Sequence, residues 1–373
     1  MGNYTDFVRQ LRFGSLDGLR ALSIIAVLWH HSGVGTTAFG DGHFGVHLFF
    51  AISGFLICSL MIREKMQHGR ISLRAFYVRR SLRIIPLYYL VLLVYIAVVA
   101  LMEQGPDREE FFRNLPAFAT YTSNWFVELE PGERVIFYFA WSLAAEEQFY
   151  LTWPWVERYA PEHLKRIALG CLIGLVAATH FGLLFWLLPE GTIGETILSS
   201  VPPCILFGVA LAHLTHTPQG FSLMRAVLGQ RWSAPAVLMA AILAIVFTEF
   251  DYLVYVCLAL LVVSCTIRED NGLAQLLGTR PLVRLGVVSY GIYLLHMLGF
   301  SVAERVGPAV GIDNRWVLWA VGCLLAYGAA ELSYRTFERF FLSLKERART
   351  TTDGGGIALG YARPLTGEGR KRD

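Results

Sequence analysis

Long apolar runs dominate this chain. Each run has roughly 17–25 residues, enough for a helix to cross a hydrocarbon core of about 30 Å. Only 16% of the residues are charged and the mean hydropathy is +0.48, whereas soluble domains carry about 25% charged residues. The sequence therefore predicts an all-α integral membrane protein, a bundle of about ten transmembrane helices. The expected spans are roughly 17–34, 44–62, 84–102, 138–156, 166–188, 196–213, 233–249, 251–267, 284–303 and 315–337.

Charged residues between the runs predict how the bundle is oriented. The segment between the second and third runs is basic and carries Arg63, Lys65, Arg70, Arg74, Arg79, Arg80 and Arg83. The next segment is acidic and carries Glu103, Asp107, Glu109, Glu110, Glu128, Glu130 and Glu133. By the positive-inside rule the basic segment faces the cytoplasm, and counting spans from it makes both termini cytoplasmic.

The remaining composition narrows the possible partners and domains. A net charge of +3 is too small to indicate a nucleic-acid partner. The cysteines all lie in apolar runs without CxxC spacing, so we interpret them as small hydrophobic residues rather than disulfides or metal ligands. Residues 1–345 are expected to form the membrane domain. Residues 346–373 are polar and glycine-rich, and we expect a flexible cytoplasmic tail there.

Arg20 and His31 lie in the first run, where ionisable residues are costly if they are inside a membrane. Eleven residues separate them, so a helix places both on one face, roughly 16 Å apart along its axis. Arg20 then lies near the cytoplasm and His31 near the outside. Each residue could instead be an ordinary interfacial anchor, and the pair alone leaves both readings open.

The fourth run begins WSLAAEEQFY, in which Ser142, Glu146 and Tyr150 share one helix face. Glu146 is expected at a depth similar to that of His31, where a carboxylate could orient or charge the imidazole of a general base. The alternative is that Glu146 lies in water at the outer interface.

The ninth run contains SYGIYLLH, which places Ser289, Tyr293 and His296 on neighbouring positions of one face. His296 is as consistent with a buried core residue as with a substrate contact. His47 lies at a similar depth. His31, His47 and His296 are too far apart in sequence to form a local ligand pair with one another, so no metal site is expected.

Arg80 and Arg83 lie one helical turn apart just before the third run, in AFYVRRSLRIIP. Guanidinium groups bind phosphate well, so the pair could hold the phosphates of a nucleotide-containing donor at the inner interface. Both could equally be topology signals.

In these blocks the sequence resembles the acyltransferase 3 family of integral-membrane O-acyltransferases, which modify bacterial surface glycans and some small molecules. The resemblance spans nearly the whole chain. It rests on an ordered set of motifs: Arg20 with His31, Gly45 to Ile57, Arg80 and Arg83 before Pro86, Trp141 to Tyr150, Ser289 to His296, and Phe337 to Arg339. Two positions depart from the family pattern: His47 stands where aspartate is usual, and Phe340 where proline is common.

The resemblance implies a multi-pass enzyme of the bacterial inner membrane that uses cytoplasmic acyl-coenzyme A, most often acetyl-coenzyme A, as co-substrate without a permanently bound cofactor. It implies that His31 is the general base and that Arg20, Arg80 and Arg83 serve the active site or the donor. We add Glu146 as a second catalytic candidate. The substrate-binding candidates are Ser142, Tyr150, Tyr293 and His296, of which Tyr293 or Ser142 could donate to the oxyanion.

The expected acceptor is a hydroxyl of a cell-surface or lipid-linked polysaccharide, with a secreted small molecule such as a macrolide as the alternative. A secondary transporter is the main rival from another class, because buried Arg, His and Glu also mark ion and substrate paths. The two halves of the chain show no repeat, which disfavours a transporter. A scaffold subunit of an export system is a third possibility.

Overall fold

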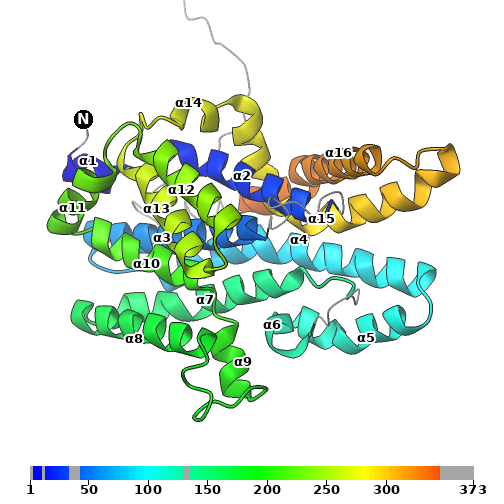
Figure 1. The fold of residues 1–373 in the computed structure, drawn as a ribbon, viewed down its shortest axis with the longest axis horizontal. Coiled ribbons are helices and arrows are strands. Elements are labelled where there is room, and N and C mark those ends of the chain that lie inside the picture. The colour runs from blue at the N-terminus through cyan, green and yellow to red at the C-terminus, as the bar shows by residue number, and fades with distance from the viewer. Residues whose placement is uncertain (1–2, 11–12, 33–42, 129–134, 345–373) are drawn as a thin grey trace, which may run out of the picture.

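The computed structural model describes residues 3–10, 13–32, 43–128 and 135–344 (Figure 1). All regular structure in these ranges is helical. The expected tail, 346–373, lies outside them. The helices are α1 (Tyr4–Arg9), α2 (Gly14–His30), α3 (Phe44–His68), α4 (Leu73–Met102), α5 (Pro106–Ala119), α6 (Ser123–Phe126), α7 (Ala140–Tyr159), α8 (Glu162–His180), α9 (Ile193–Ser199), α10 (Pro203–Thr215), α11 (Pro218–Leu228), α12 (Ser233–Phe247), α13 (Asp251–Ile267), α14 (Ala274–Leu277), α15 (Arg280–Val306) and α16 (Arg315–Ser333), followed by a π-helical turn at Tyr334–Glu338.

The apolar helices agree with a membrane protein, but ten spans are not confirmed. Within the described ranges, four helices are long and apolar enough to cross a membrane, or six if each of two bent pairs counts as one span. The run expected at 196–213 is one such pair, since α9 and α10 meet at a bend of 57°. Pro202 and Pro203 lie at this break, where proline cannot continue a helical hydrogen-bond ladder.

Helix α4 begins earlier than the sequence predicted. Ser72 caps it, with the side chain accepting a hydrogen bond from the Ala75 amide at 3.4 Å, and the helix then continues for 30 residues. Such a helix is about 45 Å long, longer than an apolar core is thick. Arg80 and Arg83 therefore lie within this helix and not in a segment before it, and they project from it among the other helices.

Two glycines allow the central helices to approach closely. A Cβ atom on Gly54 of α3 would lie 2.2 Å from the Ile205 carbonyl oxygen of α10. A Cβ atom on Gly286 of α15 would lie 1.8 Å from the Asp17 carbonyl oxygen of α2. Small residues at helix crossings are the usual means of close packing between membrane helices. Of the helices at these crossings, α2, α3 and α15 also line a polar cavity.

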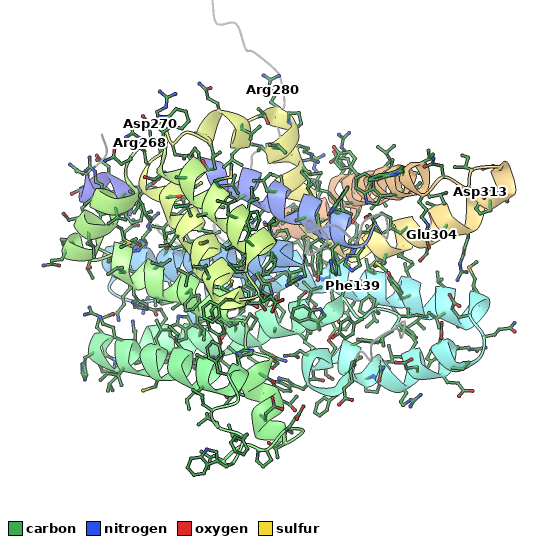
Figure 2. All side chains as sticks on the ribbon, in the orientation of Figure 1. Phe139, Arg268, Asp270, Arg280, Glu304 and Asp313 are labelled. Atoms are coloured by element: carbon green, nitrogen blue, oxygen red, sulfur yellow. The ribbon has the colours of Figure 1, made fainter. Side chains whose placement is uncertain are left out.

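Figure 1 shows α3, α4 and α7 lying along the long axis of the molecule. We call the end where α3 finishes and α4 begins the basic end, after the arginines and lysine of residues 63–83. The opposite end holds the last turn of α15 and the start of α16. Figure 2 shows Glu304 toward that opposite end, Arg268 and Asp270 toward the other, and Phe139 between them.

Candidate active site

A cavity of about 80 Å³ lies between α2, α3, α4, α7 and α15, and we call it the central cavity. The polar groups on its wall come from widely separated parts of the chain. They are Arg20, Ser53, Arg80, Arg83, Ser142, Glu146, Ser289, Tyr290 and Tyr293. The structure thus brings together all three arginines that the sequence singled out, with Ser142, Glu146 and Tyr293 beside them.

Arg80 is held in the central cavity by a carboxylate and an aromatic ring. Its Nη2 atom lies 3.4 Å from Oε1 of Glu146, and its guanidinium carbon lies 3.6 Å from the centroid of the Tyr150 ring. The Tyr150 and Ser53 hydroxyls both donate to the same Glu146 oxygen. Tyr150 therefore contacts both Arg80, through its ring, and Glu146, through its hydroxyl group, and helps to hold the pair in place.

This arrangement corrects one prediction about Glu146. The sequence suggested that Glu146 orients the His31 imidazole, whereas the structure pairs Glu146 with Arg80, Ser53 and Tyr150. The helix face was read correctly, because Glu146 and Tyr150 do share it. The partner differs because α4 extends further than its apolar run, and its arginines therefore reach Glu146.

Arg20 also has an acidic neighbour. Its Nη1 atom bonds Oδ1 of Asp17 at 2.9 Å, one turn earlier on α2, and its side chain is 13% exposed. Arg83 lines the same cavity one turn after Arg80. The result is a small, largely buried space with three guanidinium groups in its wall, a composition suited to phosphate or another anion.

Two hydroxyls meet at the wall of the central cavity between α7 and α15. The Ser142 Oγ and Tyr293 Oη atoms are 2.5 Å apart, and both lie within hydrogen-bond distance of the Phe139 carbonyl oxygen, at 3.1 and 3.0 Å. Tyr293 can therefore donate to Phe139 while Ser142 donates to Tyr293, or the reverse. Either hydroxyl could turn toward an oxygen in the cavity, as an oxyanion donor must.

A second cavity, of about 290 Å³, opens beside His31, and we call it the end cavity. Helices α2, α15 and α16 form it at the end opposite the basic one. Its wall consists of His31, Ser32, Phe300, Glu304, Arg315, Leu318 and Trp319. The Nδ1 atom of His31 lies 3.0 Å from the Val27 carbonyl oxygen. A carbonyl accepts only, so this contact assigns the proton to Nδ1 and leaves Nε2 with its lone pair.

His296 lies behind His31 and is fully buried. The two ring centroids are 4.9 Å apart, with planes at 66°. Nδ1 of His296 lies 2.6 Å from the Tyr293 carbonyl oxygen, which assigns the proton to that nitrogen as well. Its Nε2 atom has no hydrogen-bond partner within the described ranges. In each histidine, Nε2 is therefore the ring nitrogen that carries the lone pair.

These contacts connect the two cavities through a short series of side chains. Tyr293 lines the central cavity, its ring centroid is 5.6 Å from that of His296, and His296 contacts His31 in the wall of the end cavity. Sequence reasoning found all three residues. It missed Glu304, Arg315 and Trp319, because a charged residue or tryptophan at a helix end is also what a membrane interface selects.

The sequence left the role of His47 open, and in the structure it lines neither of the two cavities, although ring contacts through His43 and His30 link it to His31. Its ring centroid lies 4.5 Å from that of Tyr255 on α13 and 5.7 Å from that of His43. His47 therefore replaces the usual acidic residue with an aromatic contact between α3 and α13.

One group of potential metal ligands occurs among the described residues, toward the basic end. The ligand atoms of Cys58, Glu157 and His213 lie within 4.8 Å of one another. Glu157 already accepts from Lys165 at 2.7 Å and lies 3.2 Å from Nε2 of His213. Because the Lys165 ammonium balances the Glu157 charge, we interpret the group as a buried ion-pair network that joins α7, α8 and α10.

Comparison with known protein families shows which family this chain belongs to. The family model described as "Acyltransferase domain" matches residues 13–335, which include every helix that lines the two cavities. The chain belongs to the acyltransferase 3 family. The resemblance stated from the sequence motifs is therefore confirmed.

Similar curated proteins are O-acetyltransferases by name. A peptidoglycan O-acetyltransferase of Listeria monocytogenes is 28% identical over 87% of this chain and 55% of its own length. A putative O-acetyltransferase of Staphylococcus aureus is 26% identical over 91% of this chain and 58% of its own. A putative peptidoglycan O-acetyltransferase of Bacillus subtilis is 28% identical over 87% and 54%.

The chain thus spans little more than half the length of these relatives. No solved structure matches it. The chain is thus a member of the acyltransferase 3 family that carries helices long and apolar enough to cross a membrane.

Proposed function

We propose that this protein transfers an acetyl group from cytoplasmic acetyl-coenzyme A to a sugar hydroxyl of a surface glycan, with His31 as general base. The main support is the position of His31 and His296 between two cavities of different character. The central cavity is rich in guanidinium groups, and the end cavity combines aromatic and polar groups. A donor and an acceptor could therefore meet at the histidines from opposite sides.

The donor side of the proposal rests on Arg20, Arg80 and Arg83. Coenzyme A carries several phosphates, and guanidinium groups bind phosphate through paired hydrogen bonds. Arg20 and His31 are roughly 16 Å apart along α2, close to the length of an extended pantetheine arm. Phosphates held near Arg20 would therefore present the thioester near His31. The basic end would face the cytoplasm of a bacterium, in its cytoplasmic membrane.

The acceptor side draws on the relatives from Listeria monocytogenes and Bacillus subtilis, whose names specify peptidoglycan. We extend that acceptor class to this chain and place it in the end cavity. A polysaccharide hydroxyl that enters there would approach Nε2 of His31. This nitrogen is the ring atom that the Val27 contact leaves unprotonated.

The proposed reaction balances without any metal or redox group. Nε2 of His31 accepts the sugar hydroxyl proton while the sugar oxygen forms a bond to the thioester carbonyl carbon. The Tyr293 or Ser142 hydroxyl donates to the carbonyl oxygen as its negative charge develops. The carbon–sulfur bond then breaks, and His31 returns the proton to the leaving thiolate. The products are an acetyl ester and free coenzyme A.

The decisive experiment uses the purified full chain in lipid vesicles with radiolabelled acetyl-coenzyme A and peptidoglycan fragments. We expect label in the glycan, with a loss of about 10²–10⁴-fold in kcat for His31→Ala, the range typical of a general base. His30→Ala is the matched control, because His30 is the adjacent, exposed histidine on the same helix. Full transfer by His31→Ala would exclude His31 as the base, and label that never leaves coenzyme A would refute the proposed function.

A further inference from the structure

We infer that the end cavity binds a single sugar unit of the acceptor, with its ring stacked on Trp319 and its polar groups bonded by Arg315 and Glu304. This inference rests on the proposed function and extends it, because it assigns the acceptor to residues that neither the motifs nor the comparisons identify. Three features of the end cavity support this assignment: its size, the contacts that hold Trp319, and the charges of Arg315 and Glu304.

The size of the end cavity limits its occupant. Its volume of about 290 Å³ lies at the lower end of the roughly 300–1,000 Å³ found for small-molecule sites. One pyranose ring fits such a space, whereas a longer stretch of glycan must continue outside it. His31 forms part of the wall, so a ring seated there places its hydroxyls next to the proposed base.

Trp319 provides a fixed flat surface inside this cavity. Its indole N–H donates to the Leu28 carbonyl oxygen at 3.0 Å, close to the end of α2. The Trp29 ring packs edge-on against it, with centroids 5.8 Å apart and planes at 89°. An aromatic ring held in this way loses little freedom on binding, and its apolar face suits the C–H groups of a sugar ring.

Arg315 and Glu304 supply opposite charges to the same cavity. Arg315 is the first residue of α16, and Glu304 lies in the last turn of α15. Within the described ranges neither forms an ion pair, so both side chains are available to a ligand. A carboxylate accepts from sugar hydroxyl and amide N–H groups, and a guanidinium donates to sugar oxygens.

The two charges also predict what kind of sugar is preferred. The negative charge of Glu304 and the positive charge of Arg315 cancel, so the lining of the end cavity has no net charge that would favour an anion or a cation. Phe300 and Leu318 add an apolar lining. The end cavity therefore matches an uncharged sugar ring with hydroxyl and N-acyl groups better than a multiply charged one.

The position of Arg315 on α16 is set by the cap of that helix. The Asn314 side chain accepts from the amides of Trp316 and Val317, at 2.9 and 3.3 Å. This cap sets where the helix begins and places Arg315 and Trp319 one turn apart on one face. The two residues can then contact one ligand together.

The test measures binding and transfer separately on the full chain in detergent. The probe is the soluble disaccharide–peptide fraction that a muramidase releases from peptidoglycan, titrated by calorimetry in the absence of donor. We expect wild type to bind it, Trp319→Ala to weaken binding about tenfold, and Trp319→Phe to retain most of the affinity. Trp186→Ala is the control, because that tryptophan is 81% exposed and lies outside both cavities.

Arg315→Gln and Glu304→Gln keep the test informative if Trp319→Ala does not fold. Each should weaken binding about two- to tenfold and raise the KM for the glycan, with an unchanged KM for acetyl-coenzyme A. Wild type that fails to bind the probe would overturn the inference, as would Trp319 and Arg315 variants that bind like wild type. If binding depends on Trp319 but no acetyl group is transferred, the site stands and the proposed reaction fails. If transfer occurs with an unaltered glycan KM in these variants, the reaction stands and the site fails.

Discussion

The rings of His31 and His296 lie 4.9 Å apart, and each has its Nδ1 atom against a carbonyl oxygen of its own helix. The backbone thus sets the same tautomer on both histidines. A carboxylate often has this role in enzymes, and here a turn of helix replaces it. His31 faces the end cavity, whereas His296 is buried behind it.

His296→Gln should lower kcat about 10- to 100-fold and leave the KM for both substrates near the wild-type value. His296 would act on His31 and not on a substrate, because it lies in the wall of neither cavity. Steady-state kinetics at several pH values would measure this, together with a shifted pH profile. The exposed residue His163 offers the control His163→Gln. A change confined to KM would assign His296 to substrate binding instead.

Arg80 and Glu146 should behave as one unit. Arg80→Gln should raise the KM for acetyl-coenzyme A at least tenfold, since a guanidinium in the central cavity would be lost. Glu146→Gln should also raise it, because the carboxylate that holds Arg80 in place is removed. A double-mutant cycle on this KM should give a coupling of about 0.5–3 kcal/mol. Additive effects would show that the two residues act independently.

The network of Lys165 and Glu157 should matter for stability more than for chemistry. Lys165→Met should lower the free energy of unfolding by about 3–5 kcal/mol, because it leaves the fully buried Glu157 carboxylate without its 2.7 Å partner. The double variant Lys165→Met/Glu157→Gln should recover much of this loss. Thermal unfolding in detergent would measure both.

Lys65 provides the control for this experiment. Its ammonium lies 3.5 Å from Glu162 at a site where both side chains are substantially exposed, so Lys65→Met should change stability by less than about 1 kcal/mol. Equal effects of the two lysine substitutions would argue against a special role for the buried pair.

Gly54→Ala should disrupt the crossing of α3 and α10, since the added carbon would lie 2.2 Å from a backbone oxygen. We expect a lower unfolding temperature and a loss of activity as the wall of the central cavity shifts. Gly174→Ala on α8 is the matched control, because an added carbon there meets nothing within 4 Å. A normal unfolding temperature for Gly54→Ala would mean that the helices can separate without cost.

Hydropathy predicted where helices occur, because burial in lipid requires long apolar runs. It misplaced the start of α4 by about three turns, since Leu73 to Arg83 is helical although it carries several arginines. It also treated 196–213 as one span, although Pro202 and Pro203 break it. Packing and local backbone chemistry decide both features, and neither contributes to a hydropathy average.

The site was predictable where helix periodicity alone determined it. Ser142 and Glu146, and Tyr293 and His296, were expected on shared helix faces, but the arginines were expected at the inner interface, whereas Ser142 and Tyr293 line one cavity with all three of them. The partner of Glu146 was not predictable, because the contact depends on how α4 and α7 cross. The sequence could not identify the end-cavity residues Glu304, Arg315 and Trp319 either. They lie far from His31 in the sequence and come near it only because the start of α16 packs against the end of α2.

Tyr293, His296 and His31 lie between the two cavities. This separation has an energetic consequence for a protein that works across a membrane. Under the proposed reaction, only an uncharged acetyl group passes the histidines, while the charged nucleotide stays on one side and the glycan on the other. Moving one elementary charge across 100 mV involves about 2.3 kcal/mol, whereas moving an acetyl group involves none. Turnover should therefore be the same in polarised and depolarised vesicles, and the thioester bond alone would supply the driving force.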